Sequence, residues 1–409
     1  MAATKKHTNF METRPQKEIQ EKIQAAMERE GLDALLLTTP ENIMYSTGWC
    51  TPLYNWRQTG TAMAVVPKHG KASIIVSQFE QGGPVQQTKD VDIVSYPVWI
   101  FIEDFYDPNE KTKDVQPDMY RTFRMAMDII KEKTGADKPK VGIELGYMPH
   151  DKYLFLEEAF GADNLKNISD MMIKVRTIKL PWEIDILRYA AKVTEKMMGL
   201  TMLMTEPGMT EADIYKLWWQ SAYEITGGHD IVSVSQAHTP GPDFWAGYMA
   251  RERELREGDI VRIDGGVSLY GYISDLGRSY CIGDKVPEKS QAIFDTLLAA
   301  HDAEVAMMQP GNKLKDAFHA AMEVCHKGAL PHFVRGHFGH TLGMGPGEEY
   351  PMLDPNNELV MEPGMVFCCE TPYYSSKFGS FNIEDTLVIT ESGHERFTHT
   401  NRSLIVGMK

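Results

Sequence analysis

The sequence predicts two domains, an α/β domain followed by a strand-rich domain that also contains helices. The chain has 409 residues, which exceeds one ordinary core and suits two domains of about 100 to 200 residues each. Helix-like and strand-like segments alternate in the first half, whereas strand-like runs dominate after residue 230.

The first half begins with an amphipathic helix over residues 18–30. Ile19, Ile23 and Met27 lie on one helical face, and Gly31 ends the helix. Short apolar runs between polar or Gly/Pro breaks predict strands, and one longer periodic segment predicts a second helix. We expect strands over 34–37, 62–66, 72–76 and 140–143, and a helix over 119–133.

A domain boundary is expected near Pro181, which precedes a long amphipathic stretch over 183–204. Another helix should begin at Thr210, because Asp213 stands where a capping box usually has Glu or Gln. We therefore expect domains of residues 1–178 and 179–409. The second should contain strands over 259–263, 272–274, 365–369 and 382–389, and helices over 291–308 and 314–327.

The composition is that of a globular protein. Apolar residues make up 43% and charged residues 24%, which excludes a disordered chain, a collagen-like chain and a coiled-coil rod. The net charge of −15 disfavours nucleic acid and anionic membranes as partners. With no apolar window of about 18 residues and no apolar segment after Lys5 and Lys6, we expect a cytoplasmic protein that does not bind membranes.

The five cysteines form no CxxC pair and do not describe a disulfide framework, which fits a reducing compartment. Cys368 and Cys369 are neighbours in an apolar strand-like run. We expect them to be buried small hydrophobic residues rather than a redox pair.

Five potential metal ligands lie in or beside the strands of the second half. Asp264 and Asp275 follow successive strand-like runs, so a hairpin would bring their carboxylates together. His340 lies in a Gly-His-Thr-Leu-Gly segment, Glu370 closes the run over 365–369, and Glu384 stands in another apolar run. A carboxylate on the inner face of such strands is costly unless it is paired.

Four converging carboxylates repel one another, and a pair of divalent cations would let all of them stay ionised. One imidazole among oxygen donors suits Mn, Fe, Co or Zn better than Ca. Two ions at about 3.5 to 4 Å could lower the pKa of a bridging water and polarise a substrate. Taken singly, Asp264 could be a turn residue, Glu384 part of a solvated edge and His340 a core histidine.

Together the five segments resemble the pita-bread metallopeptidase family, which includes methionine aminopeptidase, Xaa-Pro aminopeptidase, prolidase and creatinase. The matching segments are Ile263-Asp264-Gly265-Gly266, Ser274-Asp275-Leu276-Gly277-Arg278, Gly339-His340, Met361-Glu362-Pro363-Gly364-Met365-Val366 and Ile383-Glu384-Asp385-Thr386. The segment Arg176-Thr177-Ile178-Lys179 with Glu183 also resembles the family, and residues 42–48 do so more loosely.

The resemblance implies an α/β N-terminal domain of creatinase type over 1–178 and an α+β pita-bread catalytic domain over 179–409. It implies a dinuclear centre with Asp264 and Asp275 on one side, His340 and Glu370 on the other, and Glu384 bridging. Glu370 and Glu384 are the candidate catalytic residues. It also implies a homodimer, in which the N-terminal domain of one subunit helps to close the partner's site.

The sequence departs from the peptidases of the family at two positions. They carry a histidine about seventeen residues before the first Asp and another seven residues after the metal-binding His, where this chain has Gly247 and Gly347. Neither glycine can move a proton. His238, His332 and His337 are candidates to replace them, although structural or solvated roles are favoured.

These losses suggest a fold retargeted to a small molecule, in a branch that resembles ectoine hydrolase or dimethylsulfoniopropionate lyase. The segment 239–245 is similar to one in the lyase, which places a Trp there, but Gly266 stands where the lyase has an extra Asp. Aromatic and basic side chains could line a pocket for a compact cationic or zwitterionic substrate, although ordinary packing is the favoured alternative. The candidate substrate-binding residues are Trp56, Arg57, His238, Trp245, His337 and Tyr373.

The function predicted is metal-dependent hydrolysis of a carbon-nitrogen bond in a small amide, amidine or dipeptide-like substrate. Three alternatives remain: an Xaa-Pro peptidase, a metal-dependent lyase of the dimethylsulfoniopropionate type, and a non-catalytic binding protein.

Overall fold

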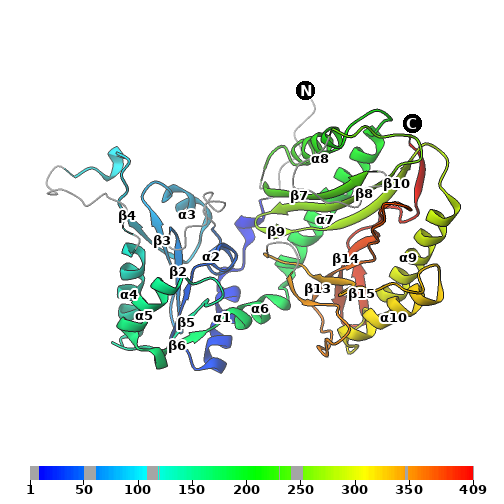
Figure 1. Ribbon diagram of the computed structural model, residues 1–409. Helices are drawn as coiled ribbons and strands as arrows, with labels where there is room; N and C mark the ends of the chain where they lie inside the picture. Colours follow the sequence, from blue (N-terminus) through cyan, green and yellow to red (C-terminus); the bar gives the residue numbers. More distant parts are fainter. Residues whose placement is uncertain are drawn as a thin grey trace. The chain divides into compact units, whose positions relative to one another are not determined.

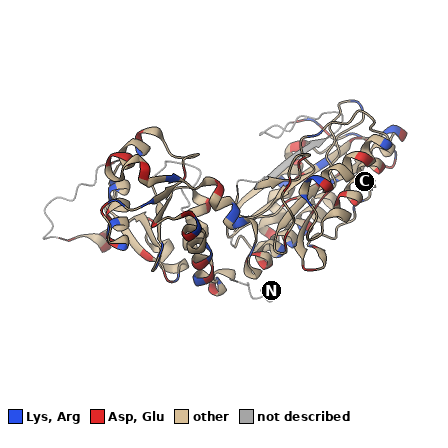
Figure 2. Ribbon diagram, turned by 90° about the horizontal axis from the view of Figure 1, so that it is seen from below, with Lys and Arg blue, Asp and Glu red and all other residues tan. Residues whose placement is uncertain are grey.

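The computed structural model describes residues 9–49, 61–107, 118, 120–229, 231–240, 252–345 and 349–408. It divides into two compact units, Met1–Arg176 and Thr177–Lys409 (Figure 1). Acidic and basic residues are interleaved along the helices of both units (Figure 2). Within the residues described, no helix combines the length and apolar character needed to cross a membrane.

The N-terminal unit is built on a six-stranded mixed sheet in the order β4-β3-β2-β1-β5-β6 (Figure 1). Its strands are β1 (Ala34–Leu37), β2 (Met63–Pro67), β3 (Ser73–Ser77), β4 (Asp92–Tyr96), β5 (Val141–Ile143) and β6 (Leu165–Asn167). Its helices are α1 (Gln16–Glu30), α2 (Pro40–Thr47), α3 (Gly82–Gln87), α4 (Arg121–Thr134), α5 (His150–Phe160) and α6 (Ser169–Thr177), with 3-10 turns at Phe10–Thr13, Glu103–Phe105 and Ala162–Asn164.

The predicted elements of this unit are present with shifts of one to two residues. Helix α1 starts two residues earlier than expected and ends where Gly31 adopts a left-handed conformation with φ of 67°. The carboxylate of Glu144, after β5, accepts hydrogen bonds from the backbone N–H groups of Thr38 and Thr39 at 2.5 and 2.9 Å and from Asn42 at 2.5 Å. This buried carboxylate therefore ties the start of α2 to β5.

The C-terminal unit contains two five-stranded sheets (Figure 1). The first has the order β16-β10-β8-β7 with β9 beside β8, and the second has the order β12-β11-β13-β14-β15. The strands of the first sheet are β7 (Ile231–Pro240), β8 (Ile260–Leu269), β9 (Tyr272–Ile273), β10 (Leu276–Ile282) and β16 (Ile405–Met408). Those of the second are β11 (Gly339–Thr341), β12 (Glu349–Met352), β13 (Val366–Glu370), β14 (Glu384–Thr390) and β15 (Gly393–Arg396).

Among the residues described in this unit, four helices pack on these sheets: α7 (Pro181–Met204), α8 (Glu211–Thr226), α9 (Glu288–Met307) and α10 (Leu314–Lys327). Helices α7 and α8 contact β8 and β7, whereas α9 contacts α10 and β13. Asp213 does close the capping box of α8, because its carboxylate accepts the backbone N–H of Thr210 at 2.8 Å. The core between α9, α10, β13 and β14 contains Val305, Leu314, Phe367, Cys369 and Leu387.

Strand β8 runs six residues further than expected, because Asp264-Gly265-Gly266 continues the strand instead of turning. The chain turns later, at Tyr270 and Gly271, which both have positive φ values. A Cβ atom at Gly266 would lie 1.9 Å from the backbone oxygen of Ser274. The second glycine therefore allows the close approach of the next strand and is not a turn signal.

Candidate metal centre

Three strands of the second sheet carry three of the predicted ligands side by side. Strand β11 holds His340, β13 ends at Glu370, and β14 begins at Glu384. Glu370 and Glu384 face each other in the β13–β14 register, so their side chains lie on the same face of the sheet. His340, Glu370 and Glu384 are 2%, 6% and 1% exposed, so the solvated edge considered for Glu384 is wrong.

The first sheet supplies the two aspartates. Asp264 lies inside β8 opposite Gly277 of β10, and the turn considered for Asp264 is therefore wrong. A Cβ atom at Gly277 would lie 2.9 Å from the Glu384 Cβ, so this glycine lets the two sheets approach. Asp275 stands between β9 and β10, and its backbone oxygen accepts a hydrogen bond from Thr386 at 2.9 Å.

The donor atoms converge on Glu384. One carboxylate oxygen each from Asp264, Glu370 and Glu384 lie within 4.8 Å of one another, as do one donor atom each from His340, Cys368 and Glu384. Asp275 belongs to neither group, although its charge helps to raise the pKa of Glu384. The fold thus brings together four of the five predicted ligands. The fifth, Asp275, is adjacent to them, with its backbone oxygen 3.7 Å from Cys368 Sγ.

Burial and mutual repulsion dominate the electrostatics of the cluster. Burial first, and then the charges of neighbouring carboxylates, raise the pKa of Asp275 and of Glu384 well above the usual range. Burial raises the pKa of Asp264 as well, against the charge of Arg262. For Glu370 burial also acts upward, but the cationic Arg335 and the neighbouring histidines outweigh it and lower the pKa.

Three polar side chains that the sequence analysis did not single out support the carboxylates. Arg262 donates to Asp264, and Arg335 donates to Glu370 at 2.5 Å. Asn382 donates through Nδ2 to Asp264 and to Glu384, both at 3.1 Å. With all four carboxylates ionised, the two guanidinium groups would offset half of the negative charge, and a negative excess would remain for cations to balance.

The donor set fits divalent cations. Three carboxylates, those of Glu370 and Glu384 buried and that of Asp264 partly buried, place oxygens within 4.8 Å of one another, which is costly without a counterion. The Oδ1 atom of Asn382 is buried without a hydrogen-bond partner among the described residues. Asp264, Asp275, His340, Glu370 and Glu384 could hold such ions, because carboxylate oxygens with one imidazole suit divalent transition metals.

Only some of the predicted substrate-binding residues are described, and they differ in whether they lie beside the carboxylate cluster. His337 lies beside the cluster, with Nδ1 3.6 Å from Glu370 Oε1. The ring of Tyr373 packs between Phe333 and Phe381, with both centroid distances at 6.3 Å, which favours the packing alternative. His332 is exposed, and only the backbone of His238, in β7, is described. The predictions for Trp56, Arg57, Trp245, Gly247 and Gly347 lie outside the described residues.

The described cysteines are buried as expected, but Cys368 has a polar neighbour, the Glu384 carboxylate. Cys281, Cys325, Cys368 and Cys369 are all buried and free of disulfides. Cys369 faces the core of α9 and α10, whereas Cys368 faces the carboxylates.

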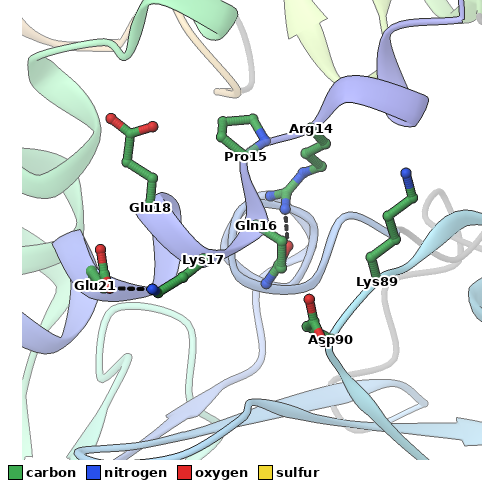
Figure 3. Close-up of a pocket in the computed structure, with 8 residues that line it drawn as sticks. All are labelled: Arg14, Pro15, Gln16, Lys17, Glu18, Glu21, Lys89 and Asp90. Carbon is green, nitrogen blue, oxygen red and sulfur yellow. Dashed lines mark hydrogen bonds and ion pairs between the residues drawn. The ribbon is translucent and has the colours of Figure 1, made fainter.

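A surface pocket lies in the N-terminal unit, and Figure 3 shows the side chains that line it: Arg14, Pro15, Gln16, Lys17, Glu18, Glu21, Lys89 and Asp90. Arg14 donates to Gln16 there, and Lys17 pairs with Glu21 at 3.7 Å on the exposed side of α1. Of the predicted site residues that the structure describes, none lines this pocket, and its lysines and acids are ordinary solvated charges.

Comparison with known proteins identifies both halves of the chain. Residues 185–391 match the model of metallopeptidase family M24, and residues 20–178 match that of the creatinase/prolidase N-terminal domain. The chain belongs to metallopeptidase family M24. This membership confirms the predicted fold, a creatinase-type N-terminal domain followed by a pita-bread catalytic domain, and the predicted class, a metal-dependent hydrolase.

Individual relatives align with most of the chain, in sequence or in structure. An uncharacterized peptidase, YqhT, of Bacillus subtilis is 26% identical over 396 residues, which cover 94% of this chain and 99% of the relative. The Xaa-Pro dipeptidase of Pyrococcus furiosus is 28% identical over 273 residues, or 65% of this chain and 75% of the relative. The structure of an Xaa-Pro dipeptidase from Bacillus anthracis superposes with a TM-score of 0.78 at 22% identity, covering 96% of this chain and 99% of the other.

Proposed function

We propose that this M24 protein hydrolyses the carbon-nitrogen bond of a compact zwitterionic amide, amidine or dipeptide at a centre of two divalent cations, Mn, Fe, Co or Zn. The ligands proposed are Asp264, Asp275, His340, Glu370 and Glu384. The observation that carries the proposal is the convergence within 4.8 Å of oxygens from the partly buried Asp264 and the buried Glu370 and Glu384, with His340 beside Glu384. When bound, such ions supply Lewis acidity and lower the pKa of water held in the site.

The side chains of this protein hold the reacting groups in place. Arg335 fixes the Glu370 carboxylate by its 2.5 Å hydrogen bond, and Asn382 fixes the Glu384 carboxylate. Glu370 and Glu384 are the groups proposed to orient the attacking water and to accept its proton. Burial keeps bulk water from competing for these hydrogen bonds.

Arg262 offers an anion-binding position at the edge of the cluster. Its side chain is 3% exposed and donates through Nη2 to Asp264 and to the Tyr374 hydroxyl at 3.1 Å. Its Nε and Nη1 atoms are buried and have no hydrogen-bond partner in the part of the chain that is described. A carboxylate of the substrate would supply the acceptors that this guanidinium lacks.

The test is a product analysis of the metal-loaded protein with Xaa-Pro dipeptides, their C-terminal amides, ectoine and creatine, and dimethylsulfoniopropionate. We expect hydrolysis of a small charged substrate. Arg262→Met should raise KM more for carboxylate substrates than for the amides, because both lose the contact between Arg262 and Asp264 but only the carboxylates lose a partner. Because Gly247 and Gly347 cannot move protons, Xaa-Pro turnover should be lower than that of the family's peptidases. General acid-base groups typically raise a rate about 10²-fold or more, and we expect a loss of that size. Xaa-Pro kcat/KM of about 10⁴ M⁻¹s⁻¹ or more would identify a peptidase, and release of acrylate with a sulfide would identify a lyase.

The domain division at residues 1–178 and 179–409 and the homodimer are also part of this proposal. The division of the contacts at Arg176 and Thr177 supports the first. Sedimentation of the full chain tests the second.

A further inference from the structure

Cys368 occupies the place in the sheet next to His340. The register pairs His340 of β11 with Cys368 of β13, and Cys368 in turn with Thr386 of β14. Directly opposed residues of antiparallel strands project from the same face, with Cβ atoms about 4.5 to 5.5 Å apart. Cys368 is also two residues before Glu370, so strand alternation points both side chains to the same face.

The sulfur lies among the proposed ligands. Cys368 Sγ is 2.9 Å from Glu384 Oε1, 3.7 Å from the Asp275 backbone oxygen and 3.8 Å from Thr386 Oγ1. With a ring nitrogen of His340 and an oxygen of Glu384 it forms a group whose members lie within 4.8 Å of one another, all buried. Two ligands of one ion, with a metal–sulfur bond of about 2.3 Å and a metal–nitrogen bond of about 2.0 Å, lie at most about 4.3 Å apart. The three donor atoms lie within 4.8 Å of one another, close to this range, so side-chain movements would let them share an ion.

The neighbouring cysteine has a different environment. Cys369 is equally buried but faces the opposite side, in the apolar core with Val305 and Leu387. The two adjacent thiols therefore differ in the face that they occupy and form a matched pair for experiment.

We propose that the Cys368 sulfur is a ligand of the metal centre, completing with His340 and Glu384 a sulfur-nitrogen-oxygen subsite beside the carboxylates of Asp264, Asp275 and Glu370. This inference rests on the proposed metal centre and adds a ligand to it. On coordination the S–H bond breaks, a metal–sulfur bond forms, and the proton leaves to solvent. A thiolate shifts the metal preference from Mn toward Zn, Co or Fe.

The first test is cobalt substitution of the full chain under reducing conditions, with bound cobalt counted by elemental analysis. A near-ultraviolet thiolate-to-cobalt charge-transfer band should appear in the wild type and in Cys369→Ser, and should be lost in Cys368→Ser. Zinc affinity should fall at least about tenfold in Cys368→Ser, as for other ligand-shell changes, with manganese affinity little changed. The Cys369→Ser variant should keep the wild-type affinity for both metals.

The second test needs no variant. X-ray absorption of the zinc-loaded wild type should show one sulfur scatterer per two zinc ions at about 2.3 Å, beyond the nitrogen and oxygen shell at about 2.0 to 2.1 Å. Bound cobalt without the band, a band that persists in Cys368→Ser, or a zinc shell without sulfur would overturn the sulfur ligand while leaving the metal centre intact. A protein that binds neither cobalt nor zinc would overturn both the inference and the proposed function.

Discussion

Arg278 and Asp385 form an ion pair of 2.7 Å in which the two side chains are 2% and 0% exposed. Arg278 also donates to the backbone oxygen of Glu384 at 2.6 Å, and Asp385 accepts further hydrogen bonds from Arg396 and Thr398. The pair joins β10 to β14, and it fixes the backbone that presents Glu384 to the centre.

Removing the carboxylate of this pair should strongly destabilise the protein. In Asp385→Ala the buried guanidinium of Arg278 keeps its charge without a counterion, which typically costs about 3–5 kcal/mol. Chemical denaturation should show that loss in the free energy of unfolding. Glu323→Ala is the control, because its exposed pair with Lys327 contributes less than about 1 kcal/mol. Equal effects of the two changes would contradict a structural role for the buried pair.

His301 should make stability depend on pH in the mildly acidic range. Burial lowers the pKa of this histidine from 6.5 to about 4, despite the nearby Asp385. Between pH 6.5 and about 4, His301 is therefore protonated in the unfolded chain but stays neutral in the folded chain. Stability is therefore full above about pH 6.5 and is lost as the pH falls toward 4, by at most about 3 kcal/mol.

Denaturation of the wild type and of His301→Gln at pH 4.5 and 7 isolates this contribution from that of the other histidines. Glutamine does not titrate, so the variant should lose less stability on acidification. The same loss in both proteins would rule out His301 as the source.

Two glycine-to-alanine changes should act in opposite directions. In Gly266→Ala the new Cβ would meet the Ser274 backbone 1.9 Å away, so we expect a loss of stability or of folding and disruption of the hairpin that carries Asp264. In Gly199→Ala, on the exposed side of α7, no atom of the described residues lies within 4 Å of the new Cβ, so helix propensity should add about 0.5–1 kcal/mol. Thermal unfolding of both variants measures the difference, and a tolerated alanine at 266 would disprove the close approach.

The wild type should carry up to two divalent metal ions, and Glu384→Ala should lower that content and abolish turnover while leaving the fold largely intact. The carboxylate of Glu384 lies in both groups of converging donors, so its loss affects each ion. Elemental analysis and circular dichroism measure content and folding. Glu358→Ala, which removes an exposed acid paired with Lys313, should keep full metal and activity. Wild-type metal and kcat/KM in Glu384→Ala would refute the bridging role.

Periodicity predicted the elements whose burial is regular. Helix α10 occupies the range expected, and α1, α4 and α9 differ from theirs by one to three residues at their ends. Caps and fraying determine the exact boundaries of a helix, and periodicity does not report them. The Gly-Gly after Asp264 indicated a turn where the strand continues, since glycine serves both turns and close strand contacts. Only the position of Ser274 distinguishes the two roles.

The ligands of the centre were easier to predict than their neighbours. Arg262, Cys368 and Asn382 each stand two residues before a predicted ligand, and strand alternation alone could have placed them on the same face. Arg335 could not be found in this way, because its contact with Glu370 depends on how the segment before β11 folds back.

The origin of the donors in two sheets affects how the protein folds. Asp264 comes from the first sheet and Glu384 from the second, across about 120 residues of chain, so neither sheet alone offers the full set. A chain growing from its N-terminus cannot assemble the centre until β14 has been synthesised and the two sheets have met. Contacts of this sequence separation form slowly, and any ion that binds only the finished site stabilises that last-formed junction. Metal capture would thus report that the C-terminal domain has completed its fold.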